Sequence, residues 1–276
     1  MIKKTKQLVC PSLISLFKKI KLKTFLLLTV VLTTVFGNKK LNAQVEVDTT
    51  FQTAINQIFE NVDKTKVPYG ILKDYAMEFI ELSHFNGTSV LTDSTATNIG
   101  YFYDVYYTLF TGRINNSATG FVHPDTLNNQ WYALRDTGKI VLSGLLFKYS
   151  KFKDNAAGNY ITISGNQLYD KYVGGIWQDP YTTDLAFMVS PPVNKYSQQN
   201  LQVVLPSGLW FTNTSYSSFE VDFADGLGYR SIAFNTPISL SYATNGYKNW
   251  KFKLIMPDGV KYVHTNFLIG TDPGSL

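Results

Sequence analysis

The last third of the sequence alternates apolar and polar residues with a period of two, which restricts it to half-buried β-strands. The clearest runs are residues 238–242 and 250–254. Their apolar positions are Ile238, Leu240, Tyr242, Trp250, Phe252 and Leu254. Asn245-Gly246 and Pro257-Asp258-Gly259 are turn sequences that separate such strands. Short strands at this spacing are typical of an antiparallel β-sandwich.

A second feature of this region is the stretch 209–226, which reads LWFTNTSYSSFEVDFADG. It contains an alternating strand over 219–223 followed by Ala-Asp-Gly, and it resembles the W-D-F-G-D-G signature of the polycystic-kidney-disease (PKD) domain. Val221 stands where that motif has Trp, and Ala224 replaces its first Gly. The resemblance covers about residues 200–270 and implies an immunoglobulin-like sandwich with no catalytic residue.

The centre of the chain also predicts strands. Residues 139–149 (KIVLSGLLFKY) are almost continuously apolar, as in a strand buried on both faces. Residues 160–164 and 184–189 are shorter strand candidates, and Pro191-Pro192 begins a polar linker. We therefore predict a β-rich region over 137–197 and a PKD-like sandwich over 198–276.

The segment before these strands, 44–136, is expected to be mainly α-helical. Apolar residues recur with helical spacing over 48–62, 71–82 and 98–110, and a shorter helix is predicted from Pro124 to Arg135. Together these regions predict an α+β multidomain fold.

The N-terminus resembles a secretory signal peptide. Residues 1–43 contain nine Lys, no Arg and no acidic residue, and an apolar run of about 12 residues ends before Leu41-Asn42-Ala43. We expect cleavage near Ala43 and export to the periplasm, cell surface or medium; the alternative is a permanent N-terminal anchor. The single cysteine, Cys10, would be lost with the signal, so the exported chain would lack disulfides.

The charge balance argues against nucleic-acid binding. The chain has a formal net charge of +5, but without the nine N-terminal lysines 16 basic residues face 20 acidic ones, a net of −4. Such a chain would repel phosphates. No cofactor is predicted, and no membrane association is expected once the signal is removed.

No short catalytic motif is present. The three histidines, His84, His123 and His264, are far apart in sequence and are not in metal-ligand spacing. A nucleophile elbow, a P-loop and a dinucleotide fingerprint are also missing. The sequence thus indicates no catalytic residue and no metal site.

Two acidic clusters have both a functional and a structural interpretation. Asp74, Glu78 and Glu81 would lie on one face of the predicted helix. They could form an acid/base or cation site, but a face exposed to solvent is the simpler and favoured interpretation. Asp222 and Asp225 could ligate Ca²⁺, but two carboxylates fall short of its usual six to eight oxygens, so a turn role is favoured.

Aromatic residues suggest a binding surface. Tyr101 and Tyr107 project away from the apolar stripe of the predicted helix over 98–110, and could stack on a sugar or a protein partner.

Three functions follow as hypotheses. The first is a secreted, non-enzymatic scaffold or surface-interaction module. The second is a secreted hydrolase using carboxylates such as Glu78 and Asp222. The third is a carbohydrate- or partner-binding protein, which exposed aromatic residues in a groove would favour.

A second, weaker resemblance bears on the first hypothesis. Residues 66–270 are similar to the N-terminal region of long secreted bacterial proteins with a hydrolase-like domain downstream, through VPYGILKDYAMEF and NQLYDKYV…DPY. That resemblance implies a stand-alone or truncated version without the catalytic part.

Overall fold

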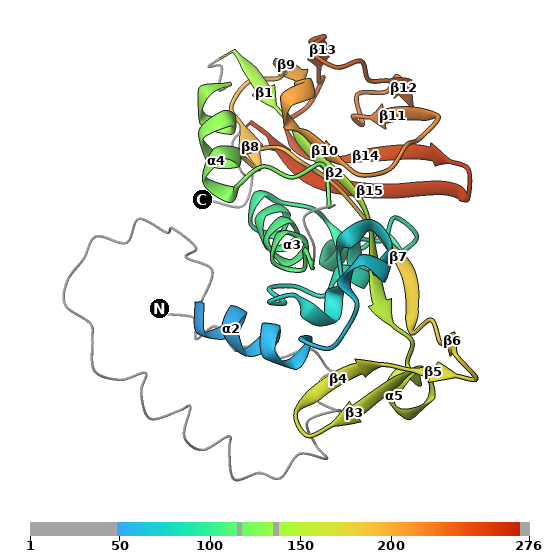
Figure 1. Cartoon of the computed structure of the whole chain (residues 1–276). Coiled ribbons are helices and arrows are strands. Elements are labelled where there is room, and N and C mark those ends of the chain that lie inside the picture. The colour runs from blue at the N-terminus through green and yellow to red at the C-terminus, as the bar shows by residue number, and fades with distance from the viewer. Residues whose placement is uncertain (1–48, 115–117, 135–137, 271–276) are drawn as a thin grey trace, which may run out of the picture.

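The computed structural model describes residues 49–114, 118–134 and 138–270, and its helices precede most of its strands (Figure 1). The α-helices are α2 (Thr49–Ile58), α3 (Ile99–Thr111), α4 (Pro124–Ala133) and the short α5 (Ala156–Asn159). Single 3-10 turns are η3 (Lys64–Lys66), η4 (Pro68–Gly70), η5 (Lys73–Tyr75), η6 (Leu82–Phe85), η7 (Asp93–Thr95) and η8 (Ser207–Leu209). Within the described residues, no helix has the length and apolar character needed to cross a membrane. The signal peptide predicted over 1–43 lies outside these residues.

The strands form three larger sheets and two small hairpins, so the α+β class with a β-rich region is confirmed. The first sheet has the order β12-β11-β14-β15-β8, the second β10-β2-β7 and the third β1-β9-β13. The small hairpins are β3-β4 and β5-β6. The bounds are β1 (Lys139–Val141), β2 (Ser143–Phe152), β3 (Ile161–Ser164), β4 (Gln167–Asp170), β5 (Tyr172–Val173), β6 (Ile176–Trp177), β7 (Tyr181–Ser190), β8 (Lys195–Tyr196), β9 (Asn200–Val204), β10 (Trp210–Thr212), β11 (Ser218–Asp222), β12 (Arg230–Ser231), β13 (Ile238–Ser241), β14 (Gly246–Met256) and β15 (Gly259–Ile269).

The antiparallel pair β2 and β7 lies at the centre of the molecule and runs from the larger sheets down to the small hairpins (Figure 1). Its two faces belong to different cores. Leu146 and Phe187 point into the core shared with β14 and β15, whereas Leu145 and Met188 pack with α3 and α4. Burial on both faces explains the continuous apolar run over 139–149, and this prediction is confirmed.

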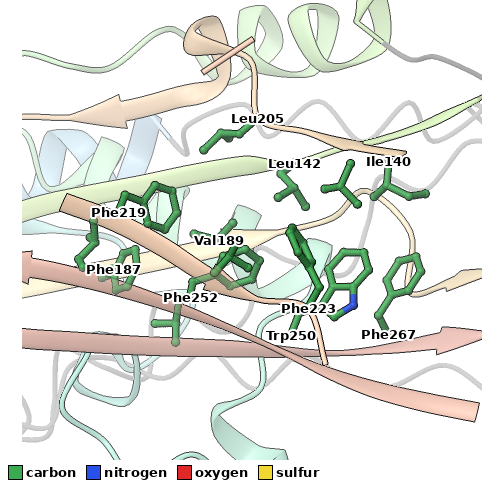
Figure 2. Packing of buried hydrophobic residues seen from close by; sticks show 14 of the residues in the cluster. Ile140, Leu142, Phe187, Val189, Leu205, Phe219, Phe223, Trp250, Phe252 and Phe267 are labelled. Carbon is green, nitrogen blue, oxygen red and sulfur yellow. The ribbon is translucent and has the colours of Figure 1, made fainter. Parts of the chain in front are cut away.

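The largest core lies between strands of all three sheets (Figure 2). Ile140 and Leu142, from the β1–β2 segment, face Trp250 and Phe267 from β14 and β15. Trp250 and Phe267 are stacked with ring centroids 4.2 Å apart. Trp250 also donates a buried hydrogen bond from Nε1 to the Tyr242 hydroxyl at 2.8 Å, so its one polar atom has a partner.

Strands on both sides of residue 198, the predicted domain boundary, pair with one another. β1 pairs in parallel with β9, β2 with β10, and β8 with β15. Residues 139–146 therefore run alongside residues 202–212, and the chain before the boundary supplies part of the core beyond it.

Three of the four predicted helices are present. Helix α2 covers most of the segment predicted at 48–62, and α4 covers most of that predicted at 124–135. Helix α3 matches the segment 98–110. It begins where the Asn98 side chain accepts a hydrogen bond from the backbone N–H of Tyr101 at 2.9 Å, and Gly112 caps its end.

The helix predicted over 71–82 is wrong. Only η5 and the start of η6 are helical there, because the backbone of this segment bonds to neighbouring elements. Leu72 donates its N–H to the Gly112 carbonyl at 2.8 Å, and the Ile71 carbonyl accepts from the Ser150 N–H at 2.8 Å. Ile71 and Leu72 also enter different cores, which a single helical face could not allow.

Candidate functional site

A cavity of about 520 Å³ opens on the outer face of the five-stranded sheet, the face opposite the core. The loop 87–91 forms one wall. Lys251 from β14, Val260 and Tyr262 from β15, and Tyr229 from the segment before β12 form the rest. We refer to this cavity, with these residues, as the groove.

The loop wall is fixed to the edge of β15 by backbone hydrogen bonds. Tyr262 donates its N–H to the Gly87 carbonyl at 2.7 Å, and further along Thr97 donates to the His264 carbonyl at 2.7 Å. Gly87 has φ +78°, and a Cβ there would lie 2.7 Å from the Cβ of Lys261. A glycine is therefore required at the point where loop and strand meet.

The loop also has local order of its own. The Asn86 Oδ1 accepts hydrogen bonds from the backbone N–H groups of Thr88 at 2.8 Å and Ser89 at 3.1 Å. This turn geometry is typical of Asn. It fixes the course of the backbone at the start of the loop, beside the sheet.

Two tyrosines give the groove its aromatic character. Tyr229 is 39% exposed and Tyr262 is 38% exposed. The Lys253 ammonium lies 4.7 Å from the centre of the Tyr229 ring and forms an ion pair with Glu220. Partial burial, with a smaller contribution from the neighbouring Tyr262, raises the pKa of Tyr229, so its hydroxyl stays protonated at neutral pH. Both rings therefore present apolar faces and hydroxyl donors to a ligand.

Beneath the loop, His264 joins β15 to the segment 92–95. It is 3% exposed, its Nε2 lies 2.9 Å from the Thr92 carbonyl oxygen, and its Nδ1 lies 2.6 Å from the Asn249 amide. Burial lowers the pKa of His264, which favours the neutral ring. This histidine supports the wall of the groove and does not line it.

The two candidate calcium ligands contact protein groups. The Asp225 carboxylate accepts from both terminal nitrogens of Arg230, at 3.0 and 2.6 Å, and its side chain is 3% exposed. The Asp222 Oδ1 accepts the backbone N–H of Ala224 at 2.8 Å. Within the part of the chain that the structure describes, no three His, Cys, Asp or Glu side chains gather in a way that could hold a metal ion.

Of the three carboxylates predicted to lie on one solvated helix face, those of Asp74 and Glu78 are instead buried among protein partners, and that of Glu81 is partly exposed. Asp74, 4% exposed, accepts the backbone N–H of Phe152 at 2.7 Å. The Lys73 ammonium lies 3.3 Å from Glu78 and 2.6 Å from Glu81, and its hydrogen bond to Glu81 contributes to lowering the pKa of that carboxyl. The prediction of a solvated face is wrong because the segment folds as tight turns against β2.

Tyr101 and Tyr107, the predicted aromatic surface, lie on α3 and not in the groove. Tyr101 is 37% exposed and packs against Phe85, with centroids 5.9 Å apart. Tyr107 is half-buried and stacks on Tyr103 at 5.8 Å. A binding role for these two residues stays a prediction.

Sequence reasoning did not find the groove residues, although a signal existed for some of them. Strand alternation places Lys251 and Tyr262 on the face opposite Trp250 and Val263, and an outward Tyr on a strand is a candidate contact. The loop 87–91 lies far away in sequence, and nothing in its composition indicates that it meets β15.

No protein-family model matches the chain, and no curated protein matches it.

Proposed function

We propose that this protein is an exported binding module without a catalytic role, and that the groove binds carbohydrate. The observation that carries this proposal is the placement of two half-exposed tyrosines, Tyr229 and Tyr262, in one cavity whose loop wall is fixed to the sheet. Such a surface requires little ordering before a ligand binds, which favours affinity.

The composition of the groove suits a sugar. The C–H faces of a pyranose ring pack on aromatic rings, while its hydroxyls need donors and acceptors arranged around them. Thr88, Ser89 and Lys251 supply such polar groups, and Val260 adds apolar contact. Mostly apolar walls with a few placed polar groups are typical of small-ligand sites.

The hydrolase alternative has weaker support. It requires two carboxylates about 5–10 Å apart in a cleft. Neither Glu78 nor Asp222 lines the groove. Glu78 is ion-paired with Lys73 and its side chain is 7% exposed, while Asp222 accepts a backbone hydrogen bond at the end of β11. A carboxylate held in this way is a poor nucleophile or proton donor.

The architecture and location are part of the same proposal. We propose that the C-terminal sheets form a PKD-like, immunoglobulin-like sandwich, supported by the alternating strand β11 and by the buried hydrogen bond between Trp250 of β14 and Tyr242, which follows β13. Export is proposed from the signal-like residues 1–43. N-terminal sequencing of protein recovered outside the cytoplasm should begin at or near Gln44; an intact Met1 terminus on membrane-bound protein would contradict cleavage.

Affinity electrophoresis tests the binding function. The purified protein is run through native gels that each contain one polysaccharide, drawn from neutral and anionic polymers. We expect retardation in at least one gel, and expect Tyr229→Ala and Tyr262→Ala each to weaken binding about fivefold or more, as loss of a central aromatic contact does. Tyr247→Ala is the matched control, because Tyr247 is an exposed tyrosine of β14 outside the groove.

Two results would contradict the proposal. One is wild-type mobility equal to that of the Tyr229→Ala/Tyr262→Ala double variant in every gel. The other is retardation that Tyr247→Ala weakens as much as the groove substitutions do. Thermal unfolding of each variant shows whether a loss of binding reflects loss of the fold.

A further inference from the structure

We infer that the sugar bound in the groove carries a negative charge, a carboxylate or a sulfate, which Lys251 recognises. This inference rests on the proposed carbohydrate-binding function and names the ligand class for the same site.

Lys251 is the one charged side chain that lines the groove in the described part of the chain. It is exposed, and its neighbours across the strands are Asp222 on β11 and His264 on β15. The pKa of His264 is lowered by burial, with a smaller contribution from the Lys251 charge, so the ring next to the lysine is neutral.

The acidic groups near this face each have a hydrogen-bond or ion-pair partner other than Lys251. Glu220 forms an ion pair with Lys253, and Asp225 holds Arg230 in a two-point contact. Asp222 accepts the N–H of Ala224. The third lysine of the region, Lys261, lies 3.5 Å from Asp258.

Lys251 therefore differs from its neighbours Lys253 and Lys261. Among the described residues it forms no ion pair, whereas Lys253 and Lys261 each have a carboxylate partner. An ammonium without an ion-pair partner, in the same groove as two tyrosines, offers a compact point charge with three donors. A carboxylate or sulfate on a sugar ring packed against those tyrosines would pair with the Lys251 ammonium. A neutral sugar would be a weaker partner for this charge.

Matched polymers separate charge from sugar identity. Polygalacturonate and its methyl ester share a backbone but differ in carboxylate charge, and dextran sulfate and dextran differ in sulfate. The affinities of the purified protein for all four are measured by affinity electrophoresis. We expect an anionic member to bind more tightly than its neutral partner, and expect that preference to shrink as salt is raised.

The decisive variant is Lys251→Gln, with Lys195→Gln as control. Both remove one positive charge, but Lys195 is an exposed residue of the edge strand β8 outside the groove. We expect Lys251→Gln to weaken binding of the preferred anionic polymer about fivefold, as an exposed charge contact predicts, and to leave the neutral polymer unaffected. Lys195→Gln should behave like wild type.

The outcomes distinguish the inference from the function on which it rests. Equal, tyrosine-dependent binding of neutral and anionic partners would overturn the inference and leave carbohydrate binding in place. So would an anionic preference that both lysine variants reduce equally, because that preference would come from net charge. Binding that does not depend on Tyr229 or Tyr262 would overturn the carbohydrate site itself. A preference for the carboxylate or for the sulfate pair identifies the anion.

Discussion

Replacement of Ala224 by glycine should stabilise this protein, although the side chain removed is only a methyl group. Ala224 has φ 57°, in the left-handed region that L-residues adopt at a cost. It follows β11 in the stretch that resembles the PKD signature, at the position where that signature has Gly. The turn conformation is held by the hydrogen bond from the Ala224 N–H to Asp222 at 2.8 Å, which a glycine would keep.

The magnitude follows from two opposing effects. The left-handed conformation costs an L-residue about 1–2 kcal/mol relative to the right-handed one. Glycine removes that cost but gives the unfolded chain more conformational freedom, worth about 0.4–1 kcal/mol. Ala224 is exposed, so little packing is lost. The net expectation is an increase of about 1 kcal/mol in the free energy of unfolding, or about 2–4 °C in Tm for a chain of this size.

Urea unfolding and thermal unfolding of wild type and Ala224→Gly measure this change. Gly226→Ala is the matched control in the same turn. Gly226 has φ +90°, and an added Cβ would meet no heavy atom within 4 Å, so its cost is conformational alone. It should lower the free energy of unfolding by about 1 kcal/mol or more. The slope of free energy against urea should be the same in all three proteins.

The reasoning would be refuted if Ala224→Gly left the midpoint unchanged or lowered it while Gly226→Ala lowered it as expected. That result would show that the backbone at Ala224 does not hold the left-handed conformation in solution. A stabilisation in both variants would contradict the conformational argument altogether.

Three further predictions concern the same half of the molecule. Asp225→Ala should lower stability by about 1.5–3 kcal/mol because it leaves Arg230 without its two-point partner, and added Ca²⁺ should not change the Tm of the wild type. The hydrogen bond from Arg230 lowers the pKa of Asp225. The ionised Asp225 carboxylate should therefore contribute to the free energy of unfolding above about pH 4, the pKa in the unfolded chain, and this contribution should disappear as pH falls through the lower folded-state pKa. Stability–pH curves of wild type and Asp225→Asn that stay parallel over this range would contradict the prediction. Tyr242→Phe should destabilise by about 1–3 kcal/mol in urea unfolding, because the Phe223 carbonyl and the Trp250 indole each lose a buried partner, whereas Tyr247→Phe at an exposed site should be neutral. The fragment 200–270 should show no cooperative thermal transition, although its strand pattern alone predicts an independent domain, because β1, β2 and β7 supply part of its core; a sharp transition in circular dichroism would refute this.

Several elements of the fold could be predicted from the sequence because their causes are local. Helix α3 has its cap at Asn98 and its apolar spacing within one segment. The alternation in β14 and β15 determines which residues face the core, whatever the partner strands are. The continuous apolar run of β2 required burial on both faces, and the structure supplies it with two different cores.

Other features depended on contacts between distant segments. The segment 71–82 has a helix-like pattern, but its backbone groups bond to α3 and β2, and its apolar residues are divided between two cores. Local propensity is a weak preference that such tertiary contacts override. The burial of Asp74 has the same origin, because the carboxylate satisfies an N–H at the end of β2.

The groove is the strongest case of a feature decided by tertiary structure. Strand alternation determines by itself that Lys251 and Tyr262 face away from the core. Whether that outer face is a flat solvated surface or a walled cavity depends on the loop 87–91, which meets β15 where Gly87 approaches Lys261 and Tyr262. Periodicity within a segment reports which face of that segment is buried. It carries no information about which distant loop lies beside the exposed face, because that is set by packing energies summed over the whole chain.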